Sequence, residues 1–180
     1  MIETERLILR PPEDRDREAL FELNADPRVG RWLSGSLSRE QTDALIARME
    51  ADIAEHGFTL WPVERKADGA VIGMAGLLAM GADLPPGPAL EVGWRFAPAA
   101  WGHGYATEAA KGALAWGFAN RPQAPEIIAI TARTNLASQA VMKRLGMVYE
   151  PWRDFDHPRV PDGSPLKAHV TYSLKRPKPA

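Results

Sequence analysis

The sequence predicts an α/β fold in which helices flank a central mixed β-sheet, built as a single domain over residues 1–180. Three observations support this prediction. Two amphipathic helical segments precede a β-hairpin, a glycine-rich turn then leads from a strand into a helix, and a short apolar segment follows at 127–131. A length of 180 residues and an apolar fraction of 45 % suit one domain with a sizeable core.

The first third of the chain is expected to hold a short strand and two helices. Residues 6–10 predict the strand, which two prolines end because proline has no N–H to donate. A helix is expected over 14–23, followed by a short turn over 28–33. Ser38-Arg-Glu-Gln41 has the spacing of a capping box, and it begins a second helix that His56-Gly57 ends.

The middle of the chain is predicted to be a hairpin. Its strands cover 58–64 and 70–80, and Gly73 and Gly76 in the second strand indicate a bulge or close packing. The loop over 81–88 contains three prolines and is a candidate for the rim of a binding cleft.

The stretch that follows carries the strongest functional signal. Its strand presents apolar side chains on one face and polar or small ones on the other, namely Leu90, Val92, Trp94 and Phe96 against Glu91, Gly93 and Arg95. Pro98 ends the strand, and Gly102 and Gly104 allow a tight turn into a helix over 104–119. The start of that helix offers unpaired N–H groups and a positive dipole end, so it predicts a phosphate or diphosphate site.

The C-terminal part is expected to complete the sheet. It contains a buried parallel strand, a helix and two closing strands, over 127–131, 136–145, 148–155 and 168–174. The loop over 156–165 is long enough to predict a function. Residues 175–180 are expected to form a flexible tail.

Composition excludes several classes of function. A net charge of −1 gives no electrostatic reason to expect nucleic acid or an anionic membrane as a partner. Without cysteine there are no disulfides and no thiolate nucleophile, which fits a cytoplasmic protein. No signal peptide or membrane span is expected, and the four histidines lack metal-ligand spacing, so no metal is expected.

Several of these motifs together resemble one family. The Glu91 strand, the glycine turn, the Ala106-Thr-Glu-Ala109 helix start and Asn135-Leu-Ala-Ser138 resemble the GNAT superfamily of acetyl-CoA-dependent N-acetyltransferases. They look most like its RimJ/RimL-type branch, named for enzymes that acetylate N-termini of ribosomal proteins. The resemblance extends to residues 4–10 and 145–147. It implies the GNAT fold, in which the strands bearing Glu91 and Ile130 splay apart and acetyl-CoA lies in the opening.

The same resemblance implies the activity. The expected reaction moves an acetyl group from acetyl-CoA to a primary amine, either a protein N-terminus or a small amine. Direct attack in a ternary complex is expected because no residue is an obvious nucleophile. A non-catalytic acyl-CoA sensor is the alternative, and a homodimer is expected because family members often pair.

The resemblance assigns acetyl-CoA to groups along this stretch. Backbone N–H groups are expected to hold the diphosphate, from Gly102, His103, Gly104, Tyr105, Ala106 and Thr107. Phe96 and Ala97 are expected to pair with the pantetheine arm as an added strand. Asn135 matches an asparagine that binds pantetheine in the family, although an N-cap role suits it equally well.

One position departs from the family pattern at this site. The family commonly has Gln or Arg three residues before the first glycine, where this chain has Ala99. Phosphate binding then depends on backbone donors alone, or on a basic residue from elsewhere in the chain.

Glu91 is the first candidate for the base, acting through a water as in many family members, and it would contact the acceptor. The alternative is a solvated strand glutamate, or one paired with Arg95. The family's usual acid, a tyrosine seven residues after the asparagine, is replaced here by Met142. Ser138 is the expected substitute, donating to the departing sulfur, and a helix-surface serine bonded to the backbone is its alternative.

Two further residues are candidates for the acceptor site. His157 lies in the 156–165 loop and could accept a proton from the amine, although the sequence favours the alternative of a loop histidine in a polar cluster. Trp32 is free to line an acceptor pocket, with buried packing as its alternative.

Overall fold

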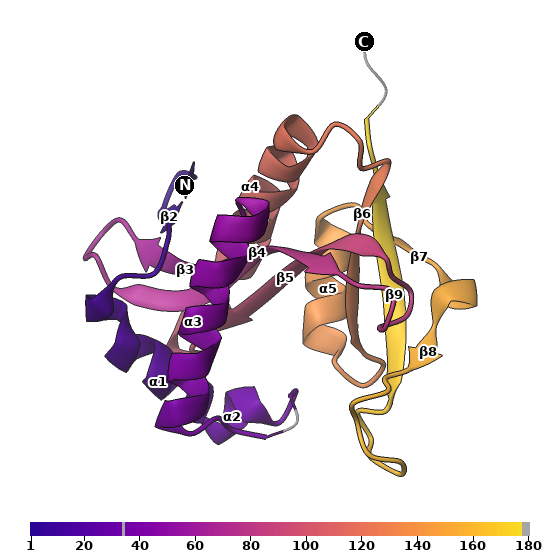
Figure 1. The fold of residues 1–180 in the computed structure, drawn as a ribbon, viewed down its shortest axis with the longest axis horizontal. Helices are drawn as coiled ribbons and strands as arrows, with labels where there is room; N and C mark the ends of the chain where they lie inside the picture. Colours follow the sequence, from indigo (N-terminus) through magenta and orange to yellow (C-terminus); the bar gives the residue numbers. More distant parts are fainter. Residues whose placement is uncertain (34, 178–180) are drawn as a thin grey trace.

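The computed structural model describes residues 1–33 and 35–177. Within them the chain forms one mixed sheet with helices on both faces (Figure 1). The strands are β1 (Ile2–Glu3), β2 (Leu7–Leu9), β3 (Leu60–Arg65), β4 (Val71–Met80), β5 (Ala89–Phe96), β6 (Glu126–Ala132), β7 (Val148–Tyr149), β8 (Phe155–Asp156) and β9 (Ala168–Lys175). The helices are α1 (Arg17–Ala25), α2 (Pro27–Gly30), α3 (Arg39–His56), α4 (Tyr105–Asn120) and α5 (Leu136–Arg144).

The strand order confirms the mixed sheet and the splayed strand pair. Along the sheet the order is β1-β2-β3-β4-β5-β6-β9-β7, with β8 paired to β9. Every neighbouring pair is antiparallel except β5 and β6, which run parallel. These two strands pair at a single position, Glu91 with Ile128, and diverge beyond it. The sheet therefore opens toward the carboxyl ends of β5 and β6.

Two hydrophobic clusters hold the layers together. On one face of the sheet α4 packs its small buried residues, such as Ala110 and Ala113, against Leu77 and Val92. On the other face α1 and α3 pack around Met74. Figure 1 shows α3 crossing the sheet on the side opposite α4. Side chains that alternate along β5 consequently face either α4 or the α1–α3 layer.

Local sequence signals are confirmed at several element ends. Ser38 and Gln41 make both hydrogen bonds of the capping box, and α3 ends at Gly57 with a left-handed φ of 78°. The close packing expected in the second hairpin strand is present, since a Cβ on Gly76 would lie 2.1 Å from the Thr59 carbonyl oxygen. Residues 127–131 do form the buried parallel strand.

Two expectations near the C-terminus are wrong. The strand predicted over 148–155 is interrupted, because Pro151 cannot donate to a ladder and begins a 3-10 turn that separates β7 from β8. The tail predicted over 175–180 does not include Lys175, which belongs to β9. The Arg176 guanidinium also donates to the carbonyls of Phe118 (2.7 Å) and Ala124 (3.0 Å). Residues 178–180 lie outside the described residues.

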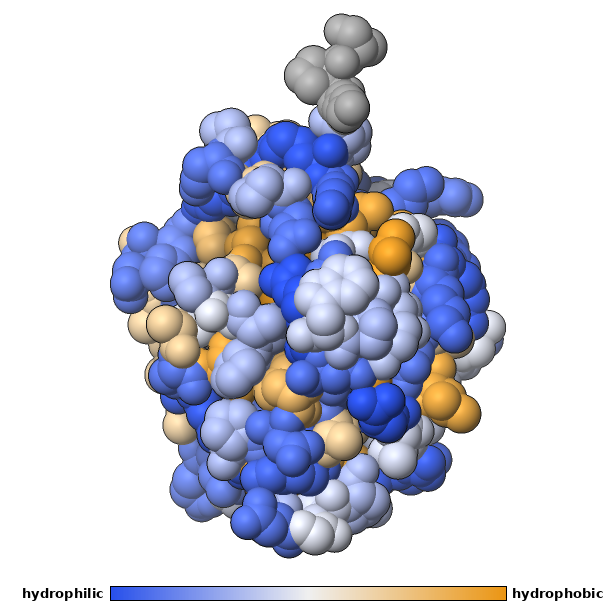
Figure 2. Space-filling model, turned by 90° about the vertical axis from the view of Figure 1, so that its right-hand side faces the viewer, coloured by the Kyte–Doolittle hydropathy of each residue, from blue (hydrophilic) through white to orange (hydrophobic). Residues whose placement is uncertain are grey.

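The surface around β7, β8 and β9 is mainly polar. Figure 2 shows this side of the molecule, where hydrophobic positions are small and separated by hydrophilic ones. Val148, Tyr149 and Trp152 are large apolar side chains exposed near this edge, at 64 %, 37 % and 76 %. Among the described helices, none combines the length and the apolar character that crossing a membrane requires.

Candidate active site

A cleft of about 1010 Å³ lies where β5 and β6 diverge. Its walls come from β5, the glycine turn, the start of α4, the end of β6 and the start of α5. It brings together most of the residues that the sequence predicted, namely Trp32, Glu91, Phe96, Gly102, Gly104, Tyr105, Ala106, Thr107, Asn135 and Ser138. Ala97, His103 and His157 are absent from its lining.

The glycine turn leaves a set of backbone donors at one end of the cleft. Gly102 and Gly104 adopt φ values of 80° and 81°, a left-handed conformation that places the helix start beside the strand end. The first helical bond of α4 runs from the Glu108 N–H to the Gly104 carbonyl, at 3.1 Å. The N–H groups of Tyr105, Ala106 and Thr107 consequently have no acceptor within the helix. Together with the dipole they form a site suited to a phosphate group.

Basic side chains reach the same end of the cleft from other elements. Lys111, on the second turn of α4, and Arg144, at the end of α5, both line it. Arg144 Nη1 lies 3.4 Å from Thr107 Oγ1, so its charge is next to the free helix amides. The basic group missing at Ala99 is therefore present, supplied by residues that sequence position alone did not connect with the turn.

A network behind the turn fixes its conformation. Arg6 donates from Nε to Glu108 at 2.7 Å and from Nη1 to the His103 carbonyl at 3.1 Å. Its guanidinium also lies 4.6 Å from the centre of the Tyr105 ring. The His103 carbonyl thus faces Arg6, and the role of the His103 N–H toward a phosphate stays a prediction.

The expected backbone partners at the end of β5 need one correction. The Ala97 N–H donates to the Ile72 carbonyl on β4 at 3.0 Å, and the Ala97 carbonyl accepts from Ala100 at 2.8 Å. Ala97 therefore has both backbone groups engaged within the protein. Because neighbouring residues of a strand direct these groups to opposite sides, the N–H of Phe96 points toward the opening. The Phe96 carbonyl accepts from the Trp101 indole at 2.7 Å.

Glu91 lies in the cleft at the point where the two strands separate. No hydrogen bond or ion pair to its carboxylate is present among the described residues, and burial raises its pKa to about 7. The pairing with Arg95 considered from the sequence is absent, because Arg95 donates to Asn24 on α1. Residues four apart on a strand are about 13 Å apart along it, which explains the separation. A half-buried carboxyl with such a pKa can exchange protons near neutral pH.

Asn135 organises the hydroxyl groups on the opposite wall. Its Oδ1 accepts from the Ser138 N–H at 3.2 Å, which confirms the N-cap role. This bond fixes the amide orientation, and Nδ2 then donates to Thr131 Oγ1 and Ser138 Oγ, each at 3.1 Å. Since Ser138 Oγ accepts from Asn135, its own proton is free to be donated into the cleft. Contact between Asn135 and a ligand stays a prediction, because its amide is already engaged.

The histidine in the cleft is not the one that the sequence suggested. His157 lies behind the wall, where its Nδ1 accepts from the Arg159 N–H at 3.2 Å and its ring lies 4.7 Å from that of His169. His169, on β9, is the histidine that lines the cleft. Burial lowers the pKa of both rings, so they are neutral at pH 7. His157 directly follows β8, and the pairing of β8 with β9 places it beside His169.

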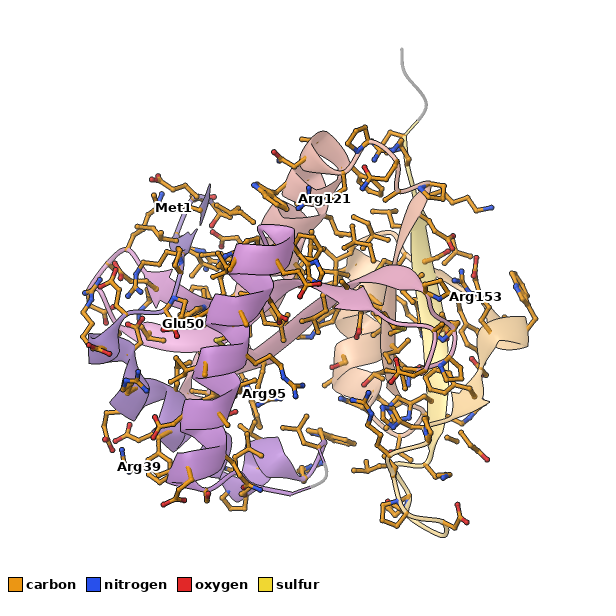
Figure 3. The ribbon with its side chains drawn as sticks, viewed as in Figure 1. Met1, Arg39, Glu50, Arg95, Arg121 and Arg153 are labelled. Carbon is orange, nitrogen blue, oxygen red and sulfur yellow. The ribbon has the colours of Figure 1, made fainter. Side chains whose placement is uncertain are left out.

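The remaining wall of the cleft is apolar except for one cation. Trp32, Val29, Leu33 and Leu60 line it on the side of the sheet covered by α1 and α3. Arg95 lies among them, and Figure 3 shows its side chain beside α3 and above α2. Burial lowers the pKa of Arg95 to about 10, which still leaves it charged at neutral pH. Within the described part of the chain, no group of three His, Asp or Glu side chains is placed to hold a metal ion.

Known proteins are similar to this chain both in sequence and in architecture. The sequence profile of the acetyltransferase (GNAT) domain matches residues 6–148. The uncharacterized protein YkkB of Bacillus subtilis is 35 % identical over 147 residues, which cover 81 % of this chain and 84 % of YkkB. A GNAT-family acetyltransferase from Bacillus anthracis superposes with a TM-score of 0.80 at 26 % identity, covering 97 % of this chain and 98 % of its own.

A more distant structure adds a likeness in fold alone. Spermidine N-acetyltransferase from Vibrio cholerae, in complex with CoA and spermine, superposes with a TM-score of 0.73 at 18 % identity. The match covers 95 % of this chain and 96 % of that one.

Proposed function

The chain belongs to the acetyltransferase (GNAT) domain family and is an acetyl-CoA-dependent N-acetyltransferase, and on that basis we propose that it acetylates a primary amine bound beside Glu91. One observation carries the proposal. A single cleft joins the free amides at the start of α4, which suit a diphosphate, to a carboxyl group whose pKa is near neutral. Acetyl-CoA and the amine can therefore meet in it.

The chain has groups suited to each part of the cosubstrate. The diphosphate would lie at the N–H groups of Tyr105, Ala106 and Thr107, beside the charges of Lys111 and Arg144. Beyond Glu91 the backbone of β5 is no longer paired with β6. The pantetheine arm would lie along this edge of β5 and form the hydrogen bonds that β6 does not. The backbone groups of Trp94 and Phe96 that face the opening would therefore bind the pantetheine, in place of those of Ala97.

Glu91 would act as the base. An alkyl amine is protonated at neutral pH and must lose a proton before it can attack a carbonyl carbon. A carboxylate with a pKa of about 7 is a suitable acceptor, either directly or through one water. The first ammonium proton passes to Glu91, and the nitrogen then forms its bond to the thioester carbon while the carbon–sulfur bond breaks. The second proton that the nitrogen loses goes to the departing sulfur, which leaves as free CoA.

Two donors would assist the breaking bond. The N–H of Phe96 faces the opening and can stabilise the charge that develops on the carbonyl oxygen. The Ser138 hydroxyl, which accepts from Asn135, can donate a hydrogen bond to the departing sulfur. Transfer takes place directly between the two substrates, because no cysteine is present and, among the described residues of the cleft, no other nucleophile lies in an activating contact.

The acceptor would be a protein N-terminus or a small amine. The resemblance to the RimJ/RimL branch supports the first, and the name of the spermidine enzyme from Vibrio cholerae supports the second. Pairing into a homodimer also stays a prediction.

The experiment is release of free CoA from acetyl-CoA, followed with a thiol reagent. The chain itself has no cysteine, so every thiol that appears belongs to the product. We expect amine-dependent release with at least one member of a panel of peptides and small amines. The exposed Glu50→Gln variant should retain the wild-type rate, and Glu91→Gln should lose it. Acetyl-CoA binding without release from any amine would refute the proposal in favour of a sensor.

A further inference from the structure

Arg95 is an unusual arginine because it is half-buried without an anionic partner. Its guanidinium donates to Oδ1 of Asn24, a neutral side chain that is fully buried on α1. Asn24 is fixed in turn, because its Nδ2 donates to the Leu20 carbonyl at 2.8 Å. Across residues 1–33 and 35–177 no carboxylate lies within ion-pair distance of Arg95. A guanidinium has five N–H donors, so within the described part of the chain most of those on Arg95 have no acceptor.

The contrast with Arg10 shows how this chain treats a buried arginine elsewhere. Arg10 is 7 % exposed, and its guanidinium lies 2.7 Å from Asp16 and 2.8 Å from Glu64. Those carboxylates raise the pKa of Arg10, whereas burial alone acts on Arg95 and lowers its pKa. A buried cation is costly unless an anion compensates it. Arg10 has that anion within the protein, and Arg95 does not.

The free donors of Arg95 face the part of the cleft suited to an acceptor. Arg95 shares its face of β5 with Glu91 and Gly93, and this face is turned toward the α1–α3 layer. The basic residues proposed for the diphosphate, Lys111 and Arg144, belong to α4 and α5. Gly93 lies between Glu91 and Arg95 and has no side chain, and the Leu60 side chain lies against it. Glu91, Gly93, Arg95 and Leu60 line the same cleft, so a ligand that passes over Leu60 can contact both charged groups.

We propose that Arg95 binds a carboxylate of the acceptor, so that the substrate is an amine that also bears a carboxylate. This inference rests on the proposed function, because it names the substrate class of the same site. A carboxylate can accept two parallel hydrogen bonds from a guanidinium, which fills donors that Asn24 leaves free. The amine lies at Glu91 and the carboxylate at Arg95, two residues on either side of Gly93 in the lining of one cleft.

The spacing along the strand narrows this class. Glu91 and Arg95 are about 13 Å apart along β5, at about 3.3 Å a residue. The amine and the carboxylate are therefore separated by several bonds, as they are between the N-terminus of a peptide and an acidic side chain next to it. The same cation disfavours a polyamine, because like charges repel inside a cleft of low polarity.

The test compares two dipeptide amides that share an N-terminal alanine and differ only in the second residue, glutamate or glutamine. We expect kcat/KM to be about 10- to 100-fold higher for the glutamate peptide, the range of a charge-assisted hydrogen bond. Arg95→Gln should reduce this ratio to about one, and Arg95→Lys should retain part of it. Arg48→Gln is the matched control, since Arg48 is exposed on α3 and outside the cleft, and it should keep the full ratio.

Asn24→Asp provides a second variant that leaves Arg95 in place. The new carboxylate would pair with the guanidinium from within the protein, so the preference for the glutamate peptide should fall. If Arg95 were only structural, the wild-type protein would have about the same kcat/KM for both peptides. Asn24→Asp would then raise thermal stability and leave the ratio of the two kcat/KM values unchanged.

The two proposals fail in different ways. Turnover of both peptides at equal kcat/KM by the wild-type protein would overturn the assignment of Arg95 and leave the acetyltransferase reaction standing. Absence of turnover with every amine would overturn the proposed function. In that case a thermal-shift titration of both peptides at saturating CoA decides the role of Arg95. A larger shift with the glutamate peptide that Arg95→Gln abolishes supports the assignment, and equal shifts overturn it.

Discussion

Replacing Glu91 with glutamine tests the proposed base through two independent measurements. The substitution keeps the shape of the side chain and removes its ability to take up a proton. Loss of a positioned general base slows reactions by about 100- to 10,000-fold. We therefore expect kcat/KM at neutral pH to fall at least about 100-fold in Glu91→Gln. For the wild-type protein kcat/KM should rise with pH up to about 7 and then level off, because the base must be deprotonated.

The same pKa sets the direction of the effect on stability. Burial raises the pKa of Glu91 from 4.5 to about 7, so between these values the folded protein binds more protons than the unfolded chain. The free energy of unfolding therefore falls as pH rises through this window, by at most about 3 kcal/mol. Glutamine carries no charge, so the free energy of unfolding of the variant does not decrease in this way. The variant should match or exceed the wild type in stability at pH 8, although it is nearly inactive there.

The assay is thermal unfolding of both proteins between pH 5 and pH 8, with Glu50→Gln as control. Glu50 lies on the exposed face of α3, away from the cleft (Figure 3). A difference of 3 kcal/mol corresponds to about 6–12 °C in Tm for a chain of this length. We expect the Tm of Glu91→Gln to gain on the wild type as pH rises, and Glu50→Gln to follow the wild type. A Tm difference that stays constant across this range would refute the raised pKa of Glu91. A wild-type rate in Glu91→Gln would refute its role as the general base.

Three further substitutions test other parts of the site and the fold. Ser138→Ala should lower kcat about tenfold with little change in the KM for acetyl-CoA, because it removes a donor to the leaving sulfur; steady-state kinetics measure both values. Arg144→Gln should raise that KM about tenfold with kcat nearly unchanged, and an unaltered KM would exclude the residue from the phosphate site. Gly117→Ala should lower the free energy of unfolding by about 1–3 kcal/mol in urea denaturation, because its Cβ would lie 2.8 Å from both Ile127 and Leu77.

Elements governed by local chemistry were predictable from the sequence. The capping box at Ser38 and the left-handed glycine at the other end of α3 are each determined by residues within one helical turn of that end. The glycine turn and the helix start at Tyr105 follow from the same short-range rules, and so does the N-cap at Asn135. The break at Pro151 is also a local signal, which the strand predicted over 148–155 does not take into account.

The rest of the cleft depends on contacts between distant segments. Arg144 and His169 reach it only because α5 and β9 pack beside β6, and nothing in their immediate neighbours indicates this. Asn24 meets Arg95 across 71 positions of the chain. The backbone direction of Ala97 likewise follows from its register with Ile72, which an eight-residue strand does not reveal by itself. Sequence patterns therefore identified the site, and sheet register decided which residues face into it.

The single residue pair between β5 and β6 also bears on how the molecule opens. β4 and β5 are paired at eight positions and β6 and β9 at seven. Among the described residues, Glu91 and Ile128 form the only strand pairing between the two halves of the sheet. Local unfolding follows the boundaries between well-bonded units, so each half should exchange its amide hydrogens as a separate cooperative block. A pantetheine arm lying along β5 would span that boundary and restrict the motion of one half against the other. Binding in the cleft would then slow amide exchange at Trp94 and Phe96. The strands at either edge of the sheet would show a much smaller change in exchange rate.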